Sequence, residues 1–98
     1  MIPKSFSVLC HDVKVVFRKD LQSDCEAFGR WWQAKNLIEI QTPNQDVTRE
    51  YAEQAFWHEA VHAIFDSLGY SEDSKDERKV DTVASCIVQI LKTSKGEQ

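Results

Sequence analysis

The stretch VTREYAEQAFWHEAVHAIFDSL, residues 47–68, decides how the chain folds. Its apolar side chains recur at intervals of three and four residues, which places them along one face of an α-helix. These positions are Ala52, Phe56, Ala60, Ala63 and Ile64. Gly69 follows at once, and glycine is a natural C-cap because it adopts the left-handed conformation without strain. A long helix is therefore predicted over about residues 47–68.

A second helix is predicted over about residues 76–92 by the same periodicity. Its apolar positions are Val80, Val83, Ala84, Ile87 and Leu91. Between the two helices, Tyr70–Lys75 is expected to be a polar connection. Because this connection is short, the helices are expected to be antiparallel neighbours. Residues 93–98 are expected to be a frayed tail.

Residues 5–41, before the first helix, contain the expected strands. Ser7–Cys10 and Val13–Arg18 are rich in β-branched residues and predict a hairpin, with His11-Asp12 as its turn. The polar residues 20–26 that follow are expected to be a loop or a short helical turn.

A second hairpin is predicted from residues 28–33 and 36–41. Pro43 ends its last strand, since proline cannot donate a hydrogen bond within a sheet. Leu37–Gln41 could be a buried strand or could offer an exposed edge to an extended peptide.

The order of elements, strands first and helices afterwards, predicts an α+β fold. The expected architecture is a small, mostly antiparallel sheet of two hairpins packed on a core of two helices. A chain of 98 residues is the length of one compact domain, so residues 1–98 are expected to form a single domain.

Composition narrows the functional classes. The formal net charge is −4 and no basic stripe is present, which argues against nucleic-acid binding. No apolar run is long enough for a signal peptide or a membrane span. Three cysteines without CxxC spacing suit reduced thiols, so a cytoplasmic location is expected, with no membrane partner.

Within the first predicted helix, His58, Glu59 and His62 form an HExxH motif. Side chains four residues apart on a helix lie one above the other, so both imidazoles can reach one metal ion. Neutral imidazole is a good Zn²⁺ ligand. The adjacent Glu59 can take a proton from a water that zinc activates. The motif predicts Zn²⁺ as the cofactor and Glu59 as the catalytic residue.

A third protein ligand is needed to complete a catalytic zinc site. A metzincin arrangement is excluded, because Phe65 and Leu68 occupy the positions that would hold its glycine and third histidine. A carboxylate is the remaining choice, and Glu77 and Asp81 share one face of the second helix.

Glu77 is the preferred third ligand, although Ser74-x-x-Glu77 also fits a capping box. Asp81 could hold a ligand histidine by a hydrogen bond, ligate the metal itself, or form a surface ion pair with Arg78 or Lys79.

The pattern His58-Glu59-x-x-His62 followed by Glu77-x-x-x-Asp81 resembles the gluzincins, zinc peptidases whose third ligand is a glutamate. It is most similar to small phage or mobile-element proteins related to the ImmA/IrrE metallopeptidase family. The resemblance covers roughly residues 38–91. It implies a zincin-like core, zinc ligation by His58, His62 and Glu77, and activity in a bacterial host cytoplasm. Asp81 departs from the family pattern, which often has Asn at the end of this motif.

The function predicted from the sequence is zinc-dependent hydrolysis of peptide bonds in a protein or peptide substrate. The alternative is a zinc-stabilised, catalytically inactive protein-binding module, in which a protein ligand or a blocked cleft replaces the reactive water. A metal-free helical-hairpin adaptor is a third interpretation. The sequence does not specify the oligomeric state.

Overall fold

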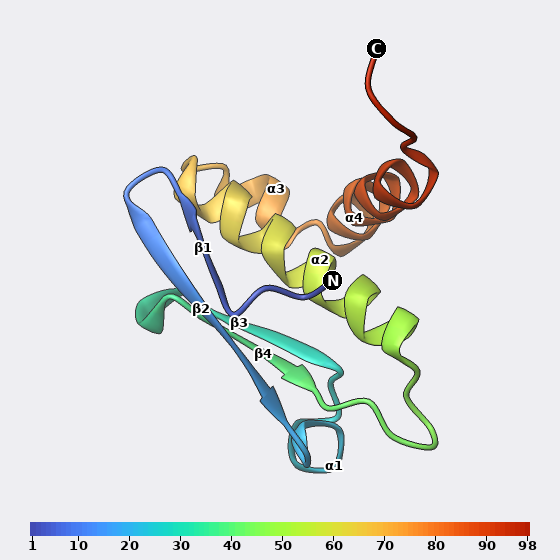
Figure 1. Ribbon diagram of the computed structural model, residues 1–98. Helices are drawn as coiled ribbons and strands as arrows, with labels where there is room; N and C mark the ends of the chain where they lie inside the picture. Colours follow the sequence, from blue (N-terminus) through green and yellow to red (C-terminus); the bar gives the residue numbers. More distant parts are fainter.

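The long helix α2, Arg49–Ser67, lies between a β-sheet and a second long helix, α4, Glu77–Thr93 (Figure 1). The computed structural model describes residues 1–98. The remaining elements are β1 (Ser5–Val8), β2 (His11–Arg18), α1 (Leu21–Cys25), β3 (Gly29–Trp32), a 3₁₀ turn (Gln33–Lys35), β4 (Leu37–Gln41) and α3 (Ser71–Lys75). The predicted α+β class is confirmed, and both long helices begin and end within two residues of the expected positions.

Opposite sides of α2 contact two different apolar clusters. Toward the sheet, α2 contributes to a cluster made of Val13, Val15, Ile38, Ile40, Ala52, Phe56 and Ala60. Toward α4, Val61 of α2 packs against Val80 and Ala84. Both ends of α2 are capped, and the predicted role of Gly69 at the C-terminal end agrees with its conformation. The Thr48 hydroxyl accepts a hydrogen bond from the N–H of Tyr51, and Gly69 has a positive φ of 79°.

The sheet is mixed, so the prediction of a mostly antiparallel sheet is wrong. Its strand order is β1-β2-β4-β3. Both predicted hairpins are present, because β1 pairs antiparallel with β2 and β3 pairs antiparallel with β4. The two hairpins are joined by a parallel pairing of β2 with β4, in which Val15 lies opposite Ile38.

Burial of β4 on both faces explains this pairing. Ile38 and Ile40 face α2 and are fully buried, while Glu39 and Gln41 on the other face are also buried. Glu39 accepts hydrogen bonds from Trp32 and Arg18, and the Gln41 amide bonds backbone groups near α1. A strand covered on both sides occupies the middle of a sheet. Leu37–Gln41 is therefore not an exposed edge, and β3 is the outer strand instead.

The predicted turn of the first hairpin is corrected. It lies at Leu9-Cys10 and not at His11-Asp12, because Leu9 adopts a left-handed conformation with φ of 53°. Asp12 instead pairs with Ser7, whose hydroxyl donates a hydrogen bond to it at 2.6 Å. Within the polar connection between the two long helices, Ser71–Lys75 form the short helix α3.

No helix of the chain combines the length and the apolar character needed to cross a membrane.

Because Ile38 is fully buried between the sheet and α2, the stability of the protein is expected to depend on the volume of its side chain. Ile38→Val removes one methylene group from a fully buried side chain and is expected to lower the free energy of unfolding by about 1 kcal/mol. Ile90→Val is the matched control, because Ile90 is 61% exposed, and it is expected to change stability by less than about 0.5 kcal/mol. Urea unfolding followed by circular dichroism measures both. Equal effects would contradict the assigned core.

Candidate metal centre

The two histidines of the HExxH motif lie one helical turn apart on α2, with ring centroids 5.2 Å apart. Both are partly buried: the side chain of His58 is 21% exposed and that of His62 is 13% exposed. They face the beginning of α4, the helix that carries the two acidic residues singled out from the sequence. The expected stacking of both imidazoles on one helix face is present.

Glu77, the first residue of α4, places its carboxylate between the two imidazoles. One oxygen, Oε2, lies 2.9 Å from Nε2 of His58, and the other, Oε1, lies 3.1 Å from Nε2 of His62. Potential ligand atoms of the three residues all lie within 4.8 Å of one another. The structure thus brings together the residues selected as metal ligands.

The capping-box interpretation of Glu77 is wrong. Asp76 is the N-cap of α4, and its carboxylate accepts a hydrogen bond from the backbone N–H of Lys79 at 3.1 Å. This cap leaves the Glu77 side chain free to lie beside the histidines.

The second ring nitrogen of each histidine contacts a side-chain oxygen. Nδ1 of His58 lies 3.3 Å from Oδ1 of Asp81, and Nδ1 of His62 lies 3.2 Å from Oγ of Ser74. These contacts orient both rings so that each Nε2 points toward Glu77. Partners of this kind fix the tautomer and direction of a ligand histidine.

Three roles are open to Asp81, and its contact with Nδ1 of His58 matches the role of orienting a histidine. The alternative ion pair with Lys79 is not formed, because the Lys79 ammonium lies 2.8 Å from Asp73 instead. The sequence did not indicate Ser74 as a site residue, because its only recognisable pattern there was a helix-capping one. Its position depends on α3, which turns the buried Ser74 side chain toward α2.

Glu59 lies beneath the outer strand β3. A Cβ atom at Gly29 would lie 3.0 Å from Cγ of Glu59, so glycine permits β3 to approach α2 closely at this point. The backbone N–H of Trp31 donates a hydrogen bond to the Glu59 carboxylate. The Trp31 indole also donates a hydrogen bond to Asp66 of α2 at 2.8 Å, which holds β3 against the helix.

Burial raises the pKa of Glu59 to about 7. The negative charge of Glu77 acts in the same direction, while the positive charges of His58 and Arg30 and the hydrogen bond from β3 oppose it. Desolvation outweighs these stabilising contacts because the carboxylate lies in a largely water-excluded position.

The pKa of His58 is raised even though burial works to lower it. The negative charge of Glu59 and the hydrogen bonds to Glu77 and Asp81 stabilise the imidazolium and outweigh the desolvation. His58 thus lies among three carboxylates, those of Glu59, Glu77 and Asp81.

The donor set suits zinc. Two imidazole nitrogens and one carboxylate oxygen form the His₂Glu set that occurs in zinc hydrolases. In a tetrahedral site with bonds of about 2.0–2.1 Å, ligand atoms lie about 3.3 Å apart. In the structure each Glu77 oxygen lies at hydrogen-bond distance from one histidine, and the candidate ligand atoms lie within 4.8 Å of one another.

No protein-family model, no curated protein sequence and no solved structure matches the chain. The chemistry of the site is therefore inferred from its geometry alone.

The buried carboxylate of Glu59 is expected to destabilise the metal-free protein at alkaline pH. Its pKa is about 7 in the folded protein and 4.5 as the reference value, so the folded state binds more protons between these values and stability falls as pH rises. About 2.5 pKa units separate these values, so at about 1.4 kcal/mol per unit Glu59→Gln is expected to raise the free energy of unfolding at pH 8 by roughly 3 kcal/mol.

The measurement is urea unfolding of both proteins in the presence of a chelator, at pH 8 and at pH 4. The two proteins are expected to converge at pH 4, where the Glu59 carboxyl is protonated in the folded and the unfolded state. A constant difference across this range would contradict the raised pKa.

Proposed function

We propose that this protein is a zinc-dependent metallopeptidase, with His58, His62 and Glu77 as zinc ligands and Glu59 as the general base. The observation that carries the proposal is the convergence of three ligand atoms within 4.8 Å, beside a buried carboxylate from the same helix. In this proposal α2 and α4 form a zincin-like two-helix core.

Zinc, when bound, would polarise a substrate carbonyl and make water a nucleophile near neutral pH. The carboxylate of Glu59 takes the proton of the attacking water and returns it to the departing amine nitrogen. Glu59 follows His58 directly on α2 and lines the same pocket, so its carboxylate is placed close to the metal position for both transfers. Asp81 and Ser74 keep the two imidazoles in place.

An extended peptide is the substrate that the sheet favours. The outer strand β3 pairs with β4 on one side only, and it passes directly over Glu59. Unpaired backbone groups along a sheet edge can bind an extended chain by strand addition. A substrate bound in this way would bring one of its peptide bonds close to the HExxH face of α2.

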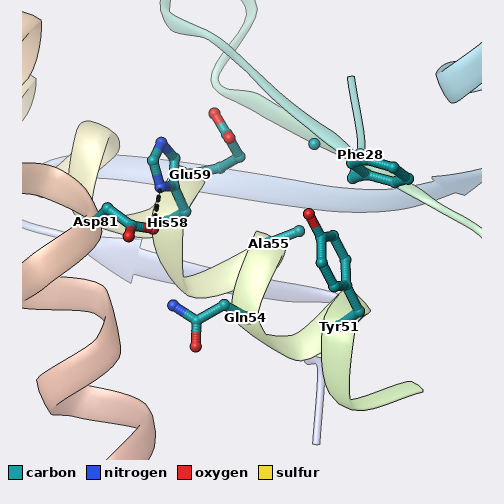
Figure 2. Close-up of a pocket in the computed structure, with 8 residues that line it drawn as sticks. Phe28, Tyr51, Gln54, Ala55, His58, Glu59 and Asp81 are labelled. Carbon is teal, nitrogen blue, oxygen red and sulfur yellow. Dashed lines mark hydrogen bonds and ion pairs between the residues drawn. The ribbon is translucent and has the colours of Figure 1, made fainter. Parts of the chain in front are cut away.

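The open space beside the site supports hydrolysis over the inactive binding module. A pocket of about 290 Å³ reaches both His58 and Glu59 (Figure 2). The inactive module requires a blocked cleft or a protein ligand in the position of the reactive water. Zinc that is retained without any hydrolytic activity would favour that alternative.

The relationship to the ImmA/IrrE family and the cytoplasmic location stay predictions. The three cysteines are unpaired, which agrees with a reducing compartment.

Zinc content tests the ligand assignment. Protein purified without added zinc is expected to contain about one zinc per chain by elemental analysis. His58→Ala and Glu77→Ala are expected to lose it, since each removes one of three ligands. Asp81→Asn and Ser74→Ala are expected to retain the site with an affinity lower by about 10 to 100-fold.

Glu72→Gln is the matched control for these variants, because Glu72 is exposed on the neighbouring helix α3. Circular dichroism establishes that each variant is folded. A folded wild-type protein that binds no zinc after reconstitution would refute the proposal. Loss of zinc in the Asp81 variant with retention in the Glu77 variant would move the third ligand to Asp81.

Peptidase activity tests the role of Glu59. Glu59→Gln keeps the size of the side chain but removes the base, so it is expected to retain zinc and lose at least about 100-fold in kcat. Cleavage of a peptide library, read by mass spectrometry with and without a chelator, measures this. Unchanged turnover in a zinc-loaded Glu59→Gln protein would show that another group activates the water.

A further inference from the structure

The pocket beside His58 and Glu59 is lined in part by apolar and aromatic side chains, which the metal centre lacks. Its volume is about 290 Å³, the volume of about ten water molecules at about 30 Å³ each, which is room for one large side chain. The residues that line it are Phe28, Gly29, Tyr51, Gln54, Ala55, His58, Glu59 and Asp81. Several of these residues lie on α2 from Tyr51 to Glu59, as Figure 2 shows.

Two aromatic rings form one wall of the pocket. Phe28, just before β3, and Tyr51, in the first turn of α2, meet edge to face with ring centroids 4.9 Å apart. Tyr51 is 51% exposed, so much of its surface is available for contact. Aromatic rings in this arrangement can pack against a further apolar or aromatic group.

Small residues keep the pocket open. Ala55 lies three residues before His58 on α2 and is 9% exposed, and Gly29 lies above it on β3. A larger side chain at Ala55 would occupy the space next to the ring of Tyr51 (Figure 2). On the remaining side, the Gln54 amide donates a hydrogen bond to Ser85 of α4 at 3.1 Å, which holds this wall in position.

The titratable groups of the pocket lie on its metal-centre side. Glu59 and Asp81 supply carboxylates there beside His58, and no lysine or arginine lines the pocket. An acidic substrate side chain would be repelled by these two carboxylates, and no lysine or arginine of the pocket would pair with it. A large apolar side chain meets the two rings and Ala55 without such a cost.

We propose that this pocket is the specificity pocket of the peptidase, and that it takes a large apolar or aromatic side chain from the substrate residue adjoining the scissile bond. The inference rests on the proposed function for its role in cleavage, but the binding preference is a property of the pocket itself. Phe28, Tyr51 and Ala55 are the residues that determine the preference.

The preference can be measured without turnover. Metal-free protein is titrated with N-acetyl-phenylalanine amide, N-acetyl-glycine amide and N-acetyl-aspartate amide, and binding is followed by NMR chemical shifts. The phenylalanine compound is expected to bind at least about tenfold more tightly than the glycine compound, because only its side chain fills the apolar pocket. The aspartate compound is expected to bind no better than the glycine compound.

Variants locate this binding. Ala55→Leu fills the pocket and Tyr51→Ala removes a wall, and each is expected to abolish the tenfold preference. Ala34→Leu is the matched control, since it makes the same change at an exposed residue in the 3₁₀ turn, and it is expected to leave binding unchanged. Equal binding of the three compounds, or a preference that survives in both pocket variants, would overturn the proposal.

In the zinc-loaded protein, a peptide library is expected to show large apolar residues on one side of the cleaved bond. Ala55→Leu is expected to shift cleavage toward glycine and alanine at that position while zinc content stays unchanged. Cleavage without this preference would refute the pocket assignment and leave the peptidase assignment intact. Selective binding without cleavage under any condition would refute the peptidase assignment and leave the pocket's binding preference intact.

Discussion

The burial of α2 between the sheet and α4 is the constraint on which the rest of the structure depends. Its sheet-facing side packs against the apolar residues of β2 and β4, and Val61 packs against α4. Alanines at positions 52, 55, 60 and 63 let neighbouring elements approach closely because they add little volume. A helix held on two sides presents its remaining face at a defined angle, and that face carries the HExxH residues.

Close packing around α2 makes the charged form of the Glu59 carboxyl less favourable. Glu59 lies under β3, where burial raises its pKa to about 7, and the Glu77 carboxylate lies between two imidazoles. Two imidazoles and a carboxylate held together in this way are groups that can ligate a divalent cation. The neighbouring pocket lies beside this packing and is lined by the small residues Gly29 and Ala55.

Local patterns predicted the parts of the molecule whose stability depends on near neighbours in the chain. Helical periodicity located α2 and α4, and the runs of β-branched residues located both hairpins, with an error of two residues at the first turn. The joining of the hairpins was not predictable in this way. The parallel pairing of β2 with β4 depends on burying both faces of β4, including Glu39 and Gln41, whose polar character reads as a solvent-exposed face in sequence.

The sequence by itself determined the residue types of the site and the stacking of His58 over His62, because four residues make about one helical turn. It also narrowed the third ligand to Glu77 or Asp81. Only the tertiary structure placed the Glu77 carboxylate between the histidines, since that depends on how α3 returns the chain to α2. The contact of Ser74 with His62, the position of β3 over Glu59 and the adjacent pocket arise in the same way. Each joins residues far apart in the chain, and such contacts are set by the packing of whole elements.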